Sequence, residues 1–311
     1  MIMDVKRPNF FIVGAPRCGT TALYSYLRQH PDVFLPEYKE PHFFNTDMNS
    51  GGAIRDEAEY LALFAAARDQ TRIGEASVYY LSSQAAPERI KKFCPKAKII
   101  VMLRNPVDAV DALHAHQVAA WLEDVWDLEQ ALALEEERKG GSHIPSWMDD
   151  PHKLFYRQTV DFAAQVRTYS EVVGWDNLHV IIYDDFKRDT AATFRQTCTF
   201  LGVTPDIQLE FPVVWSNPSF RSRALARFVR QPPGLLRRLG RMIIPSRTRA
   251  KVVNALNTWN NVRAPRQPMP VDFRNRLTAE FAPQVKELSN LLGRDLSAWT
   301  RIKDQSSFMA A

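Results

Sequence analysis

Residues 9–21 combine an apolar run with a glycine-bounded loop that could bind a phosphate group. The run ends at Gly14, and a helical pattern begins after Gly19. This glycine spacing matches a nucleotide-binding P-loop, but Thr20 stands where that loop has its lysine, and the nearest cation is Arg17. In such a loop, backbone N–H groups and the positive end of the following helix converge on one anion. The pattern therefore predicts phosphate binding without nucleoside-triphosphate chemistry.

Side chains of the same loop add donors and charge. The hydroxyls of Thr20 and Thr21 can donate hydrogen bonds, and Arg17 brings a delocalised charge with a directional fork of N–H groups. A tight strand-to-helix turn without a ligand is the alternative that the spacing alone leaves open.

The elements that must position this loop follow an α/β pattern. Apolar strands alternate with amphipathic helices, which predicts a parallel β-sheet flanked by helices on both faces, with ligands at the carboxyl ends of its strands. Arg17 and Arg104 both fall at such ends. Strands are expected at 9–14, 71–75, 97–103 and 178–183, and helices at 19–30, 56–67, 83–93, 106–120, 127–138, 156–172, 189–201 and 272–292.

The composition suits one folded domain spanning residues 1–311. A chain of 311 residues with 45% hydrophobic content can bury a full core. We expect a cytoplasmic protein, because the sequence contains neither a signal-peptide pattern nor an apolar run of about 20 residues. The cysteines Cys18, Cys94 and Cys198 are odd in number and lack metal-site spacing, which argues against a disulfide framework and a zinc site.

The charge is unevenly distributed along the chain. Residues 211–271 carry eleven arginines, one lysine and no acidic residue, whereas the net charge of the whole chain is only +5. This segment should attract anions and is compatible with contact to an anionic lipid or glycan; a solvated helical face is the alternative. No nucleic-acid-binding module is recognisable, so no nucleic-acid partner is expected.

Several further motifs occur in a fixed order along residues 9–202. They are the loop 14–23 followed by His30-Pro31, then Lys39-Glu40-Pro41-His42-Phe43-Phe44, Gly74-Glu75-Ala76-Ser77, the strand and turn 97–107, and Phe200-Leu201-Gly202. Together they resemble the sulfotransferases that use 3′-phosphoadenosine 5′-phosphosulfate (PAPS). The resemblance is closer to the heparan-type and bacterial carbohydrate branch than to the cytosolic phenol and steroid enzymes.

This resemblance implies a fold, a donor and a reaction. The fold would be P-loop-NTPase-like, with residues 9–202 as the motif-bearing core and 203–311 as a basic, mostly helical C-terminal part of the same domain. The acceptor would be a hydroxyl, or less readily an amine, of a carbohydrate, lipid or other small molecule, and no metal is required. The donor-binding residues would be Arg17, Cys18, Gly19, Thr20, Thr21, Ala22 and Arg104.

The resemblance also assigns catalytic roles. Attack on sulfur requires a base that removes the acceptor proton, and by resemblance Glu40 in the loop 36–50 is that base. His42 is the rival base, and a surface glutamate paired with Lys39 is the structural alternative. Arg17 occupies the position of the family's loop lysine, where a fixed cation stabilises the charge that builds on the departing phosphate.

One departure from the family pattern concerns the 3′-phosphate of the donor. In the family, the arginine matching Arg104 grips this phosphate together with a serine eight residues further on, but here that position is Ala112. A lost hydrogen bond to a charged group costs about 1.5–3 kcal/mol unless another donor replaces it. Arg221 and Arg223 are the candidate replacements.

Two other functions remain open from the sequence: a P-loop kinase or nucleoside triphosphatase, and a non-catalytic binder of nucleotides or anionic glycans. The strand end 179–185 mimics a Walker B strand, although helix initiation is the preferred interpretation. His114 and His116 lie two residues apart on a helix and so cannot form an i, i+4 metal pair. Glu75 and Ser77 fit either an acceptor pocket or a structural role.

Overall fold

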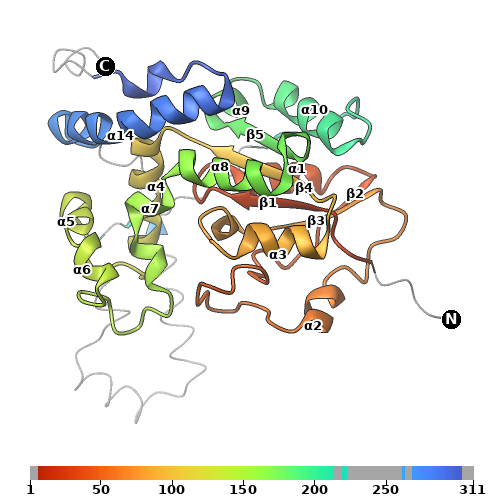
Figure 1. Ribbon diagram of the computed structural model, residues 1–311, viewed down its shortest axis with the longest axis horizontal. Coiled ribbons are helices and arrows are strands. Elements are labelled where there is room, and N and C mark those ends of the chain that lie inside the picture. Colours follow the sequence, from red (N-terminus) through yellow and green to blue (C-terminus); the bar gives the residue numbers. More distant parts are fainter. Residues whose placement is uncertain (1–5, 213–218, 221, 223–260, 263–267, 303–311) are drawn as a thin grey trace, which may run out of the picture.

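Five parallel strands form the central sheet of the computed structural model, which describes residues 6–212, 219–220, 222, 261–262 and 268–302 (Figure 1). The strand order is β2-β3-β1-β4-β5. This arrangement confirms the predicted α/β fold with a parallel sheet. The strands are β1 (Phe10–Gly14), β2 (Val33–Phe34), β3 (Arg72–Ala76), β4 (Lys98–Leu103) and β5 (Leu178–Ile182).

Helices cover both faces of the sheet, which explains why its central strands are continuous apolar runs. Every residue of β1 is buried, and so is every residue of β4 except Lys98. From β1 the chain crosses the sheet toward the β2 edge. After β3 it crosses in the opposite direction, past β1, to β4. Because crossovers between parallel strands are right-handed, this reversal places α1 (Thr20–Leu27) on the face opposite α3 (Ala86–Phe93) and α8 (Phe162–Val173). Figure 1 shows α3 and α8 side by side.

The remaining helices connect the strands or extend beyond the sheet. The α-helices are α2 (Glu57–Ala62), α4 (Pro106–Ala119), α5 (Leu128–Ala133), α6 (Glu135–Lys139), α7 (Tyr156–Thr159), α9 (Tyr183–Arg188), α10 (Thr190–Leu201) and α14 (Val271–Leu292). Short 3₁₀ turns are η1 (Val78–Tyr80), η2 (Pro151–Leu154), η3 (Trp175–Asn177) and η4 (Ser297–Thr300).

Two helices expected from the sequence are each divided in two. The segment 127–138 breaks at Leu134 between α5 and α6. The segment 156–172 breaks between α7 and α8, and there the side-chain amide of Gln165 donates to the carbonyls of Gln158 and Thr159. The two-residue strand β2 and the helix α9 were absent from the prediction, since both are too short to show a clear period.

The strand order brings the carboxyl ends of β1 and β4 together at the point where the direction of connection reverses. In open parallel sheets this switch point is where ligands bind. The glycine-bounded loop follows β1, and Arg104 follows β4. The predicted phosphate loop and the predicted second phosphate-binding arginine therefore lie at the same edge of the sheet.

The C-terminal helix expected at 272–292 is confirmed as α14. It contacts α8 and α4, and Arg274 of α14 forms an ion pair with Asp108 of α4 at 2.7 Å. Most of the basic segment 211–271 lies outside the described residues, so its predicted contact with anionic partners stays a prediction. Within the part of the chain that the structure describes, no helix has both the length and the apolarity needed to cross a membrane.

We predict that Gly14→Ala destabilises the protein, because a Cβ atom there would lie 2.6 Å from Cβ of Leu81 and 2.7 Å from the carbonyl oxygen of Val78. Overpacking of this kind costs about 1–3 kcal/mol in the free energy of unfolding, which urea denaturation would measure. The control is Gly51→Ala, whose added Cβ would meet only Asp149 at 3.4 Å. Equal stability of the two variants would contradict the predicted close contact at Gly14.

Candidate active site

The loop after β1 is tied to the neighbouring strand and opens directly into a helix. The backbone N–H of Ala15 donates to the carbonyl of Met102 in β4 at 2.8 Å. Gly19 adopts a left-handed conformation with φ of 96°, and α1 begins at Thr20. A Cβ atom at Gly19 would lie 3.0 Å from the ring of Tyr183, so the turn needs glycine for both conformation and space. The N–H groups of Ala22 and Leu23 donate to the carbonyl of Gly19, whereas those of Thr20 and Thr21 precede the first bond of the helix and are placed to bind an anion.

The predicted donor-binding residues of this loop differ in exposure. Arg17 and Gly19 are partly exposed, Thr21 is exposed, and Ala22 is partly buried, whereas Thr20 is buried. Cys18 is fully buried, and burial raises the pKa of its thiol to about 12. Its thiol donates to the carbonyl of Pro16, and its N–H donates to the carbonyl of Ala15. Cys18 therefore fills the loop rather than offering a reactive thiolate, and a donor contact by this residue stays a prediction.

Arg104 is the first residue after β4. Its guanidinium carbon lies 5.1 Å from the centre of the Tyr183 ring, and its charge and backbone N–H both act on the thiol of Cys18. Arg104 is thus adjacent to the phosphate loop. Ala112 is buried in α4, and the candidate replacements Arg221 and Arg223 lie outside the described residues. The mode of 3′-phosphate binding stays a prediction.

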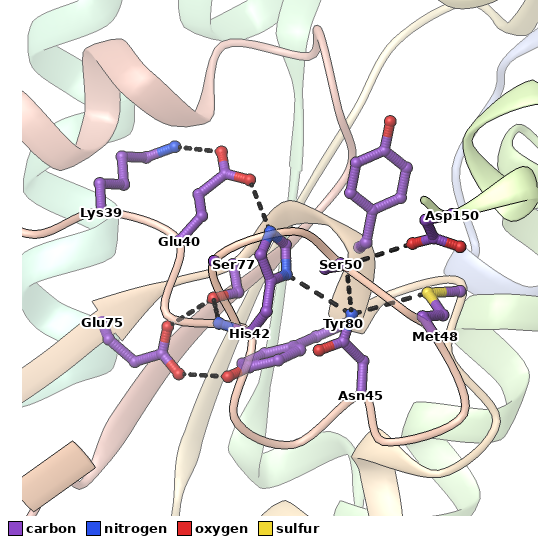
Figure 2. A network of polar contacts seen from close by, with 12 residues as sticks. Lys39, Glu40, His42, Asn45, Met48, Ser50, Glu75, Ser77, Tyr80 and Asp150 are labelled. Carbon is purple, nitrogen blue, oxygen red and sulfur yellow. Dashed lines mark hydrogen bonds and ion pairs between the residues drawn. The ribbon is translucent and has the colours of Figure 1, made fainter. Parts of the chain in front are cut away.

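Glu40 lies in an irregular segment and contacts two neighbouring side chains (Figure 2). Its carboxylate accepts a hydrogen bond from Nζ of Lys39 at 2.8 Å, and its second oxygen lies 3.3 Å from Nε2 of His42. The backbone φ angles of Glu40 and His42 are 69° and 51°, a region that non-glycine residues rarely adopt and that is enriched at functional sites. The surface-pair alternative is therefore incomplete, since Glu40 contacts His42 as well as Lys39 and is only 30% exposed.

The neighbours of Glu40 keep its carboxylate ionised. Burial raises the pKa of Glu40, but the hydrogen bond from His42 and the charge and hydrogen bond of Lys39 together outweigh it and lower this pKa to about 2, from an ordinary value of 4.5. A carboxylate in this state can accept a proton at any pH near neutrality.

The hydrogen bonds of His42 favour a supporting role for this residue over that of the rival base. The amide of Asn45 faces Nδ1 of His42 at 3.4 Å and in this orientation donates to it. With Nδ1 as the acceptor, Nε2 is the nitrogen that donates to Glu40. The same amide also donates to Ser50, whose hydroxyl donates to the buried carboxylate of Asp150 at 3.2 Å. This chain of bonds aligns His42 with Glu40 (Figure 2).

Arg55 secures the segment from the other side and was not anticipated from the sequence. Its guanidinium donates to the carbonyls of His42 at 2.6 Å, Met48 at 2.8 Å and Asn45 at 3.4 Å. No motif marks Arg55, because its partners are backbone groups and leave no pattern of residue types.

Glu75 and Ser77 are buried at the carboxyl end of β3, immediately beneath this segment. The backbone N–H of His42 donates to the hydroxyl of Ser77 at 3.1 Å, and that hydroxyl donates to Glu75 at 2.9 Å. Of the two roles left open by the sequence, this burial favours support of the loop.

Glu40 and Arg17 act on the same neighbouring side chains, Tyr79 and His116. Burial, and then the charge of Arg17, lowers the pKa of His116 to about 4, whereas Glu40 opposes this shift. The charges of Glu40 and Arg17 also both act on the pKa of Tyr79. Both predicted catalytic residues are thus near enough to Tyr79 and His116 to shift their pKa values, while the catalytic roles of Glu40 and Arg17 stay predictions.

The metal-binding alternatives find no support in the side-chain contacts. His114 is hydrogen-bonded to the carbonyl of Val125, away from His116. In the Walker B-like segment, Asp184 accepts from the indole of Trp299 at 2.8 Å and Asp185 pairs with Arg188 and Arg294, in the first turn of α9 where acidic residues favour helix initiation. Across the described ranges, no three His, Cys, Asp or Glu side chains are grouped as a metal site requires.

Known proteins resemble this chain in sequence and in fold. A sulfotransferase from Alicyclobacillus acidocaldarius superposes with a TM-score of 0.72 at 34% identity, over 96% of this chain and 100% of that chain. The bifunctional heparan sulfate N-deacetylase/N-sulfotransferase 4 of Mus musculus is 27% identical over 208 residues, which are 64% of this chain and 22% of that protein.

A further relative covers a shorter stretch. The heparan sulfate glucosamine 3-O-sulfotransferase 6 of Mus musculus is 39% identical over 100 residues, which are 32% of this chain and 28% of that protein. The chain thus spans less than a third of the length of these two curated relatives. The model of the sulfotransferase family matches residues 8–206, well over half of the chain. The chain belongs to the sulfotransferase family.

Proposed function

We propose that the protein transfers the sulfuryl group of PAPS to a hydroxyl, or less readily an amine, of a carbohydrate, lipid or other small-molecule acceptor. Glu40 is the general base, and Arg17 stabilises the leaving phosphate. The observation that carries this proposal is an ionised carboxylate, held by Lys39 and His42, at the sheet edge that bears the phosphate loop. Carbohydrate acceptors are preferred, because two relatives that this chain matches are named for heparan sulfate.

The donor fits the residues present at the loop. A phosphate would be held by the first N–H groups of α1, at Thr20 and Thr21, by the side chain of Arg17 and by the close turn at Gly19. PAPS supplies an electrophilic sulfur whose bond to the phosphate oxygen breaks as the acceptor oxygen attacks. The acceptor proton passes to Glu40, and the fixed charge of Arg17 faces the negative charge that develops on the phosphate.

The low pKa of Glu40 adds a requirement for acceptor binding. A carboxylate with a pKa of about 2 is always ionised near neutrality but is a weak base. An acceptor that displaces Lys39 from the carboxylate would raise this pKa and strengthen the base at the moment of transfer. Lys39 would then act as a partner that occupies the carboxylate until the acceptor replaces it.

The two alternative functions, a nucleoside triphosphatase and a non-catalytic binder, would require different residues at the site. A nucleoside triphosphatase needs a loop lysine and a magnesium carboxylate, whereas here Thr20 stands at the lysine position and Asp184 and Asp185 are engaged with Trp299 and two arginines. A non-catalytic binder would bind the donor without turnover and would be indifferent to loss of the base.

We predict that Glu40→Gln lowers turnover by about 100- to 10,000-fold, the usual contribution of a positioned base. The assay would incubate the protein with PAPS and a panel of unsulfated and partly sulfated heparan-type oligosaccharides in EDTA, with mass-spectrometric detection of product. The control is Glu37→Gln, since Glu37 is 94% exposed. Full activity of Glu40→Gln would remove Glu40 as the base, and a requirement for magnesium would favour the triphosphatase alternative.

We predict that Lys39→Met shifts the acid limb of kcat/KM to higher pH. Glu40 must be ionised to accept a proton, so activity is lost as the pH falls through its pKa. Removing the charge and hydrogen bond of Lys39 raises that pKa from about 2 toward 4.5. The control is Lys92→Met on the surface of α3. An acid limb at the same pH in Lys39→Met and wild type would show that Glu40 does not govern it.

A further inference from the structure

Glu75 accepts hydrogen bonds from three hydroxyl groups in the interior of the protein. It is the fourth residue of β3 and is only 1% exposed. One carboxylate oxygen accepts from Tyr80 at 2.7 Å and from Tyr60 at 3.2 Å, and the other accepts from Ser77 at 2.9 Å. Among the described residues Glu75 forms no ion pair, so these hydroxyls are the groups that stabilise its charge.

Two of the three hydroxyls also contact the backbone of the segment that follows Glu40. The hydroxyl of Ser77 accepts the N–H of His42 at 3.1 Å. The hydroxyl of Tyr80 accepts the N–H of Phe43 at 2.8 Å and that of Phe44 at 3.3 Å. Figure 2 shows Ser77 beside His42, with Glu75 and Tyr80 lower in the view.

The carboxylate determines which way these hydroxyls point. A hydroxyl has one proton and two lone pairs, and an ionised carboxylate can only accept. Above the Glu75 pKa of about 7 the carboxylate is ionised, so the protons of Ser77 and Tyr80 are directed to it and their lone pairs face the three consecutive N–H groups. The backbone N–H groups favour the same orientation, because they can only donate to these hydroxyls. With this arrangement the backbone from His42 to Phe44 is held in one path.

Side-chain packing alone does not account for this path. The ring of Phe43 stacks on Tyr60 at 4.2 Å, and the ring of Phe44 meets Phe11 edge-on at 5.5 Å. These contacts anchor the two rings, but the rare backbone conformation of His42 precedes them. A buried carboxylate is also costly: burial raises the pKa of Glu75 to about 7 even though its three hydroxyl partners lower it. An apolar residue would pack at lower cost, so the acid is better explained by its hydrogen bonds to the hydroxyls that hold the backbone of His42 to Phe44.

We infer that Glu75 is a positioning residue for catalysis, which orients the hydroxyls of Ser77 and Tyr80 so that they fix the backbone of His42 to Phe44 and thereby place Glu40. The inference rests on the proposed role of Glu40 for its catalytic consequence, but the positioning itself can be measured without turnover. Glu75 does not touch the acceptor or the donor in this account, and acts only through the loop.

The sharpest test compares Tyr80→Phe with Tyr60→Phe. Each variant keeps the aromatic ring and removes one hydroxyl that donates to the same oxygen of Glu75. Only the Tyr80 hydroxyl also accepts hydrogen bonds from the backbone of Phe43 and Phe44. We expect Tyr80→Phe to lower kcat by about 10- to 100-fold, as small misplacements of catalytic groups do, with unchanged affinity for 3′-phosphoadenosine 5′-phosphate. Tyr60→Phe should leave kcat close to that of wild type. Equal losses in both variants would overturn the inference.

A second readout does not depend on activity. In protein labelled with carbon-13 at glutamate carboxyls, the Glu40 signal is assigned by its absence from Glu40→Gln. Tyr80→Phe removes the hydroxyl that holds the backbone of Phe43. This loss should weaken the hydrogen bond from His42 to Glu40 and raise the pKa of Glu40 from about 2 toward 4.5, whereas Tyr60→Phe should not. An unchanged Glu40 pKa in Tyr80→Phe would contradict positioning. If this shift occurs while Glu40→Gln retains full turnover, the positioning stands and the proposed base fails.

Glu75 itself is tested by Glu75→Gln and its combination with Tyr80→Phe. An amide cannot accept protons on both sides, so Glu75→Gln should reorient one hydroxyl and lower kcat by an amount similar to Tyr80→Phe. Because the two residues act in one network, the double variant should lose little more than either single variant. Losses in kcat that multiply in the double variant would show that Glu75 acts independently of the loop and would overturn the inference.

Discussion

The segment 39–45, which carries Glu40, has no regular secondary structure, so its position depends on hydrogen bonds between its backbone and side chains from the rest of the fold. Its N–H groups donate to Ser77 and Tyr80, and its carbonyls accept from Arg55. A helix or strand would satisfy these groups internally, whereas an irregular segment must find partners elsewhere. The fold provides these partners at the carboxyl end of β3, next to the strand that ends in the phosphate loop.

The surroundings of Glu40 and Glu75 shift the pKa values of these two carboxyl groups in opposite directions. Lys39 and His42 lower the pKa of Glu40 to about 2, whereas burial raises that of Glu75 to about 7. Such divergence is typical of sites where two acids have different tasks. In our account Glu40 accepts the proton of the acceptor group, and Glu75 orients the hydroxyls of Ser77 and Tyr80, which fix the backbone next to Glu40. The charge of Glu40 also contributes to the raised pKa of Glu75, so the two groups are coupled.

The sequence predicted the sheet and the phosphate loop because both depend on local patterns. Buried strands appear as apolar runs, and the turn at Gly14 and Gly19 requires glycine for space and conformation. The support of Glu40 was not predictable in the same way, since Ser77 and Tyr80 lie 35 and 37 residues from their backbone partners His42 and Phe43. The breaks at Leu134 and Val160 also escaped prediction, because the helical period continues across them. The roles of Glu40 and of the donor-binding residues stay predictions that the geometry favours.

The central claim is that the switch point between β1 and β4 binds a nucleotide with phosphates at both the 5′ and 3′ positions, so that the transferred group faces Glu40. Calorimetric titration with 3′-phosphoadenosine 5′-phosphate, in parallel with ATP and adenosine 5′-phosphosulfate and without magnesium, tests it most directly. The account predicts tight binding that depends on the 3′-phosphate, despite alanine at position 112. Equal binding of all three nucleotides, or no binding of any, would contradict it.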